Sequence, residues 1–218
     1  MTADPSVTPS TLTLDNVRGW ITSFHTLVTE QKAYLTELDS AIGDADHGTN
    51  LSRGMDAVAT TLDGAAPAGI GELLKGVGMT LVSTVGGASG PLYGTFFLRF
   101  AASAGDAGTL DGEAVGTALT AGLAGVVARG KASVGDKTMV DALTPAVTAW
   151  GDAIDNGATL TDAATAARDA ARLGSDSTMP LVARKGRASY LGERSAGHLD
   201  PGSVSTTLLF TALAQALP

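Results

Sequence analysis

The chain has 218 residues, of which 14 are basic and 22 acidic, and its formal net charge at pH 7 is −8. This length suits one large domain or two small ones and allows a sizeable buried core. The acidic balance argues against nucleic acid or an anionic membrane as partner, because both attract positively charged surfaces. The absence of cysteine excludes disulfides and thiolate chemistry and favours the cytoplasm as location. No signal peptide or membrane-spanning run is expected, because neither a basic, apolar leader nor roughly 20 consecutive apolar residues occur.

The predicted elements are helices. Residues 1–13 contain several Pro, Ser and Thr without periodicity and are expected to form a flexible N-terminal tail. From Leu14 onward, apolar residues recur at steps of three and four. Helices are expected at about residues 14–37, 49–62, 70–85, 92–102, 112–128, 138–154, 160–173 and 203–216. Because the connections are mostly short, residues 14–218 are predicted to form one all-α domain, an antiparallel bundle of about eight helices.

An acidic segment lies between the first two expected helices. Three carboxylates and an imidazole fall within nine positions, at Asp39, Asp44, Asp46 and His47. Like charges this close repel one another unless a cation lies between them. Oxygen ligands suit a hard ion such as Mg²⁺, although capping of the following helix is the alternative. A calcium loop is disfavoured, because its twelfth position is Met55 rather than a bidentate acid.

Glycine-rich segments connect alternate pairs of helices. In an up-and-down bundle such connections lie at the same end, so these segments are expected to meet at one rim. In the segment Gly86-Gly-Ala-Ser-Gly90, backbone N–H groups before a helix could bind an anion, although a purely structural turn is the stronger local explanation. The segments are residues 43–48, 86–91, 130–138 and 186–202.

The long segment before the last helix carries basic residues. Arg187 ends the run Arg184-Lys185-Gly186-Arg187, which is either a solvated surface cluster or a set of charges that offset a phosphate group. Further along, Asp200 precedes Pro201 and Gly202, an order typical of a helix N-cap followed by proline at the first helical position.

Several strings taken together resemble DhaL, the nucleotide-binding L subunit of bacterial dihydroxyacetone kinases. The resemblance covers nearly the whole chain from about residue 14 and implies an eight-helix antiparallel barrel with its nucleotide site at one rim. The strings are Ile42-Gly-Asp-Ala-Asp-His-Gly48, Val85-Gly-Gly-Ala-Ser-Gly-Pro-Leu-Tyr-Gly-Thr95, Gly135-Asp-Lys-Thr-Met139 with Asp141-Ala-Leu143, and Lys185-Gly-Arg-Ala-Ser-Tyr-Leu-Gly-Glu-Arg194 with Gly197-His198 and Asp200-Pro-Gly202.

The resemblance also implies roles for individual residues. Asp39, Asp44 and Asp46 match carboxylates that hold two Mg²⁺ ions on the phosphates of ADP or ATP. Arg187 matches a basic residue on the phosphate side and is the expected catalytic residue. The other expected nucleotide contacts are His47, Gly48, Thr49, Asn50, Ala88, Ser89, Gly130, Met139, Asp200, Pro201 and Gly202.

In that family a partner subunit K holds dihydroxyacetone, and the L subunit delivers the γ-phosphate to it. ADP either stays bound as a coenzyme, recharged by a phosphohistidine of subunit M of the phosphotransferase system, or exchanges freely with ATP as the direct donor. The freestanding chain and its string Gly90-Pro-Leu-Tyr-Gly94 favour the coenzyme regime. The alternatives are an ATP-dependent kinase subunit for a related ketose and, from another class, a non-catalytic helical carrier of an apolar ligand. A homodimer is left open.

Overall fold

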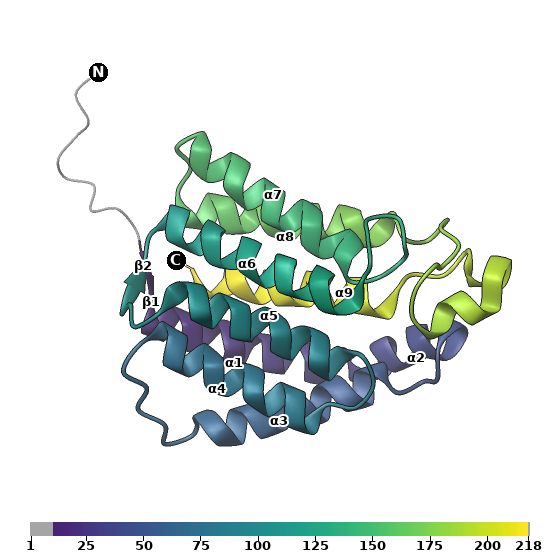
Figure 1. The fold of residues 1–218 in the computed structure, drawn as a ribbon, viewed down its shortest axis with the longest axis horizontal. Coiled ribbons are helices and arrows are strands. Elements are labelled where there is room, and N and C mark those ends of the chain that lie inside the picture. Colours follow the sequence, from purple (N-terminus) through teal and green to yellow (C-terminus); the bar gives the residue numbers. More distant parts are fainter. Residues whose placement is uncertain (1–10, 218) are drawn as a thin grey trace.

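The computed structural model describes residues 11–217, and these residues are mainly helical (Figure 1). Two short strands, β1 (Leu12–Thr13) and β2 (Thr109–Leu110), pair antiparallel, and η1 (Arg187–Ser195) is a 3₁₀ segment. The all-α prediction is confirmed. The α-helices are α1 (Leu14–Glu30), α2 (Lys32–Ile42), α3 (His47–Leu62), α4 (Ile70–Thr84), α5 (Ser89–Ala104), α6 (Gly112–Gly130), α7 (Val140–Asp155), α8 (Leu160–Asp176) and α9 (Pro201–Ala216).

The first ten residues of the expected tail lie outside the described residues. Its last part is ordered, because Leu12 is fully buried in β1 and Thr13 caps α1 by accepting the backbone N–H of Asn16. A search of the helices between residues 11 and 217 finds none with the length and apolar character needed to cross a membrane.

The prediction of one continuous helix from residue 14 to residue 37 is wrong. The helix ends at Glu30, and after Gln31 a second one, α2, begins at Lys32 and continues to Ile42. Val28 and Leu35 are both buried and are seven residues apart. The helical spacing of apolar residues therefore continues across the break, and the sequence pattern cannot predict where the first helix ends. Helix α2 packs on α3, α9 and η1 and lies at the end of the bundle (Figure 1), and Asp39 belongs to its last turn.

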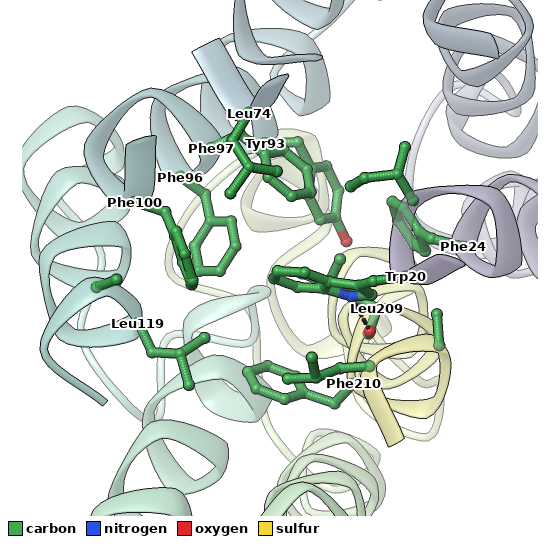
Figure 2. Close-up of a cluster of buried hydrophobic side chains, with 14 of the residues drawn as sticks. Trp20, Phe24, Leu74, Tyr93, Phe96, Phe97, Phe100, Leu119, Leu209 and Phe210 are labelled. Carbon is green, nitrogen blue, oxygen red and sulfur yellow. Dashed lines mark hydrogen bonds between the residues drawn. The ribbon is translucent and has the colours of Figure 1, made fainter. Parts of the chain in front are cut away.

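A cluster of aromatic side chains fills the centre of the bundle. Trp20 of α1 packs against Phe97 and Phe100 of α5, with ring centroids 5.8 Å and 5.7 Å away. The indole N–H of Trp20 donates to the backbone carbonyl of Leu209 in α9 over 2.9 Å, so the ring is satisfied as well as buried (Figure 2). Large buried aromatic rings contribute strongly to packing, and these contacts join α1, α5 and α9.

The glycine-rich connections meet at one end of the bundle, as expected. The α2–α3, α4–α5 and α6–α7 connections and the segment between α8 and α9 all lie at the right-hand end of Figure 1, and residues from each of them line a common cavity. The helices pack together to form the rest of the bundle.

Helices α4 and α5 approach each other closely at two glycines. A Cβ atom added to Gly78 would lie 2.8 Å from the carbonyl oxygen of Gly94, and one added to Gly94 would lie 2.8 Å from the carbonyl oxygen of Gly78. Such distances leave no room for a methyl group, so the crossing requires both glycines. The crossing in turn fixes where α5 begins at the rim.

We expect Gly78→Ala to lower the free energy of unfolding by about 1–3 kcal/mol, because the two backbones must separate to admit the methyl group. Gly76→Ala is the matched control in the same helix, where an added Cβ meets nothing within 4 Å. It should raise the free energy of unfolding by about 0.5–1 kcal/mol through helix propensity. Urea unfolding measures both, and equal effects of the two substitutions would contradict the close crossing.

Candidate functional site

A cavity of about 1010 Å³ lies at the end of the bundle where the glycine-rich connections meet. It takes residues from all four connections, which are far apart in the sequence. The expected site residues found in its lining are Asp39, Asp44, Asp46, His47, Ala88, Ser89, Gly130, Met139, Arg187, Asp200, Pro201 and Gly202.

Three carboxylates form a cluster in this lining. Asp39, Asp44 and Asp46 each offer an oxygen atom, and these atoms all lie within 4.8 Å of one another. One oxygen of Asp39 accepts the backbone N–H groups of Asp46 (2.8 Å) and His47 (3.1 Å). Asp39 therefore caps the start of α3 from the preceding helix, and it lines the cavity together with Asp44 and Asp46. Helix capping explains only part of the acidic segment.

The backbone between Asp44 and Asp46 takes an uncommon conformation. Ala45 has a φ angle of 61°, in the left-handed region that residues other than glycine rarely adopt. Asp46 occupies the N-cap position of α3, yet its side chain makes no capping hydrogen bond. An added Cβ on Gly43 would lie 2.0 Å from a carboxylate oxygen of Asp39, so only glycine fits there. The backbone conformation of residues 43–46 brings the carboxylates together, and such a cluster suits a hard divalent cation.

Arg187 lies against this acidic cluster. Its Nε is 3.0 Å from a carboxylate oxygen of Asp44, and its side chain is 67% exposed. An ion pair this exposed adds little to stability, so either partner can be taken by a ligand at small cost. Gly186, with a φ angle of 65°, is the N-cap of η1, and Arg187, the first residue of η1, lines the cavity. A guanidinium group can bind two phosphate oxygens at once.

The ring of His47 is buried between two hydroxyl groups. Its nitrogens lie 2.9 Å from the Oγ atoms of Ser89 and Ser205, and the hydroxyl of Tyr93 lies 2.7 Å from Ser205 Oγ. Burial lowers the pKa of His47 to about 4, although Asp39 acts to raise it, so the ring is neutral at pH 7. The side chain thus joins α3, α5 and α9, and it brings no positive charge to a phosphate.

Three expected nucleotide contacts are not in the cavity lining. Gly48 packs on α2, where an added Cβ would lie 2.2 Å from the carbonyl oxygen of Lys32. Thr49 lines a separate shallow hollow beside α2. Asn50 is buried beside Gly86, and its side-chain oxygen accepts a hydrogen bond from Arg53 over 2.9 Å. Direct nucleotide contact by these three residues stays a prediction.

The structure also brings Lys137 and Asp141 to the site, two residues to which the sequence pattern gives no role. The carboxylate of Asp141 accepts the backbone N–H groups of Gly135 (2.5 Å) and Thr138 (2.7 Å) and so shapes the α6–α7 connection. Lys137 lines the cavity wall but is only 1% exposed. The only feature of the sequence that points to these two residues is their charge, because most other residues of the α6–α7 connection are small.

Asp200 is the N-cap of α9, as its position before Pro201 predicts. A carboxylate oxygen accepts the backbone N–H of Ser203 over 2.6 Å. Burial raises the pKa of Asp200 to about 7, and the Ser203 hydrogen bond offsets part of that rise. Asp141 raises the pKa further, while the positive charge of Lys137 lowers it. The cavity therefore contains a carboxylic acid that titrates near neutral pH.

This shift predicts a pH-dependent stability. The pKa of Asp200 is raised from 3.8 to about 7, so its stabilising protonation is fully present below pH 3.8 and is lost as the pH rises through 7. Asp200→Asn keeps a capping oxygen and removes the charge. In nucleotide-free protein we expect the free energy of unfolding of Asp200→Asn to increase relative to that of the wild type as the pH rises from 4 to 8. The increase should be at most on the order of 4 kcal/mol. Urea unfolding that gives a pH-independent difference would contradict this.

Comparisons with known proteins agree with this geometry. A model of the DAK2 domain matches residues 41–215. The ADP-binding subunit DhaL of PEP-dependent dihydroxyacetone kinase 1 from Listeria innocua is 45% identical over 196 residues, which cover 90% of this chain and 93% of that one. The corresponding DhaL subunit from Escherichia coli is 43% identical over 205 residues, 94% of this chain and 98% of that one.

A solved structure shares the fold. The crystal structure of the dihydroxyacetone kinase from C. freundii in complex with AMP-PNP and Mg²⁺ matches with a TM-score of 0.70 at 28% identity. The match covers 98% of this chain but 36% of that kinase, so the chain spans about a third of that protein. On the match to the family model and the identity to two subunits over nearly their full length, the chain belongs to the DAK2-domain family.

Proposed function

We propose that this chain is the ADP-binding L subunit of a phosphoenolpyruvate-dependent dihydroxyacetone kinase. The observation that carries the proposal is the cluster of three carboxylates with Arg187 Nε 3.0 Å from Asp44. It offers ligands for a cation beside a donor for a phosphate, in one cavity of about 1010 Å³. The identity to two DhaL subunits over nearly their full length supports the same assignment.

The acidic cluster would hold two Mg²⁺ ions, whose chemical contribution is to neutralise the phosphate oxygens of the nucleotide. Asp39, Asp44 and Asp46 supply oxygen donors within 4.8 Å of one another, which fits hard cations that also bind phosphates. Once a cation takes Asp44, the guanidinium group of Arg187 is free to bind phosphate. Without a ligand, the guanidinium group of Arg187 pairs with the carboxylate of Asp44.

The glycine-rich turn before α5 would position the phosphates. Gly86, Gly87, Ala88 and Ser89 all line the cavity, and α5 begins at Ser89. The first N–H groups of a helix have no partner within it and attract anions, helped by the helix dipole. Gly87 has a φ angle of 66°, which only glycine adopts readily. The neutral ring of His47 fixes the hydroxyl of Ser89 at this turn.

Phosphoryl transfer here would depend on positioning and electrostatics. The phosphoryl group passes from a phosphohistidine of subunit M to the β-phosphate of ADP, and then from ATP to dihydroxyacetone held on subunit K. Arg187 offsets the charge that develops on the moving group. No nucleophile on this chain is needed, which agrees with the buried, neutral state of His47. A location in the cytoplasm, where phosphoenolpyruvate is available, belongs to the same proposal.

A second mode, in which ATP exchanges freely as the direct donor, has one observation in its favour. The C. freundii kinase that shares this fold was crystallised with AMP-PNP and Mg²⁺, an intact triphosphate analogue. The two modes place the same residues on the nucleotide and differ in how long ADP stays bound.

We expect the purified chain, freed of unbound nucleotide by exhaustive dialysis in Mg²⁺, to release nearly one ADP per chain on denaturation. Asp44→Asn and Asp46→Asn should release little, because each replaces a charged cation ligand by a neutral amide while Asp39 still caps α3. Asp152→Asn, an exposed carboxylate on α7, is the control that should retain ADP. Chromatography of the denatured supernatant measures the yield. Empty protein that binds and exchanges ATP would instead support the second mode, and indifference to both nucleotides would defeat the kinase assignment.

Arg187→Ala should lower the rate of dihydroxyacetone phosphorylation by about 100-fold to 1,000-fold, the usual loss when one charge-stabilising group is removed. ADP retention should change far less, because the carboxylate cluster and the glycine-rich turn are intact. Arg184→Ala is the matched control, since Arg184 is exposed three positions earlier and does not line the cavity. Wild-type turnover of the Arg187 variant in the reconstituted system would remove the arginine from the mechanism.

A further inference from the structure

Lys137 is a buried cation that the proposed mechanism does not use. It lies in the α6–α7 connection with a φ angle of 62°, and its side chain is 1% exposed. Its Nζ donates to the backbone carbonyls of Thr178 (2.7 Å) and His198 and lies 3.5 Å from the carbonyl of Met179. An ammonium group has three N–H donors, so these carbonyls account for all of them. Nζ is therefore committed to the protein and has no donor left for a nucleotide.

The three carbonyls belong to the two ends of one segment. Thr178 and Met179 follow α8 directly, and His198 stands just before the N-cap of α9, so the ammonium group closes the neck of residues 178–198. The neck has two further bonds, from the backbone N–H of Gly197 to the carbonyl of Met179 (2.8 Å) and from the N–H of Asp200 to the hydroxyl of Thr178 (3.0 Å). The segment is thus closed on itself beside the cavity.

The segment beyond this neck carries Arg187. Within the segment, the hydroxyl of Ser195 donates to the carbonyl of Gly192 (2.6 Å) and accepts the N–H of Ala183 (2.8 Å). The segment also contacts its neighbours, because the N–H of Arg184 donates to the carbonyl of Asp136 (3.1 Å) and Ala183 packs with Ile42 of α2. The side chain of Arg187 is two-thirds exposed and pairs with Asp44, an exposed pair that is too weak to orient a loop. The direction in which the arginine points is therefore set by these backbone and apolar contacts and by the place where the segment joins the bundle.

We propose that Lys137 is a positioning residue, which closes the neck of residues 178–198 and so holds Arg187 against the acidic cluster. It acts on phosphoryl transfer through Arg187 and does not touch the nucleotide. This inference rests on the proposed function for its catalytic consequence. Burying a cation costs free energy of desolvation. Burial therefore lowers the pKa of Lys137, while the negative charges of Asp200 and Asp141 raise it. An apolar side chain of equal length would avoid that cost but would leave the two ends of the segment joined only by the two bonds from Gly197 and Asp200.

The test compares Lys137→Met with Lys131→Met in the intact chain. Lys131 is the matched control, since it lies in the same connection, also has a positive φ angle (53°), and is exposed. Hydrogen exchange followed by mass spectrometry should show at least tenfold faster exchange in residues 178–198 of the Lys137 variant, with α1, α5 and α9 unchanged. The rate of transfer to dihydroxyacetone should fall about 10-fold to 100-fold while ADP retention stays near wild type. Lys131→Met should match the wild type in all three measurements.

A double-substitution cycle separates positioning from general destabilisation. Because Lys137 acts through Arg187, Lys137→Met should cause no further loss of transfer rate in a chain that already carries Arg187→Ala. Lys137→Arg, which keeps a buried cation with several donors, should recover part of the rate. Additive losses in the double variant, or unchanged exchange in residues 178–198, would overturn the proposal. If Lys137→Met does not fold, Lys137→Gln replaces it, because its amide still donates two hydrogen bonds without a charge.

The two proposals fail in distinguishable ways. Wild-type protein that transfers no phosphate to dihydroxyacetone would refute the proposed function. The hydrogen-exchange comparison needs no turnover, so it would still decide whether Lys137 holds the segment.

Discussion

The structure depends on keeping three like charges together. Carboxylate oxygens of Asp39, Asp44 and Asp46 lie within 4.8 Å of one another, and their mutual repulsion must be overcome before any ligand arrives. Two features of the backbone do this. An oxygen of Asp39 accepts the first N–H groups of α3, which offsets part of its charge, and a left-handed Ala45 turns the chain between the other two aspartates. The break between α1 and α2 also helps to bring the carboxylates together, since it places Asp39 on a separate helix at the end of the bundle that holds the cavity.

The rest of the bundle supports the connections that form the site. The aromatic cluster around Trp20 joins α1, α5 and α9 in the core, and His47 joins α3, α5 and α9 closer to the cavity. Lys137 extends this support to the segment that carries Arg187. Each of these side chains is buried and makes bonds to elements distant in sequence. A site made of loops is thereby held by rigid neighbours, as catalysis by positioning requires.

The sequence pattern predicts features that depend on local chemistry. The acidic segment, the N-cap at Asp200 and the meeting of glycine-rich connections follow from residue types, spacing and topology. The break at Gln31 could not be predicted, because Val28 and Leu35 stay in phase across it. Lys137 was missed for another reason. A lysine in a loop is normally exposed, and its burial becomes evident only when carbonyls 41 and 61 positions away are brought around it.

The most direct test of the account is to count the cations bound beside the nucleotide. Electron paramagnetic resonance with Mn²⁺ in place of Mg²⁺, recorded on the ADP-loaded chain, reports both the number of bound ions and their proximity. We expect two ions per chain, close enough to couple magnetically, and loss of the coupled signal in Asp46→Asn. A single ion, or two uncoupled ions unaffected by that substitution, would contradict the claim that the acidic cluster is the metal site.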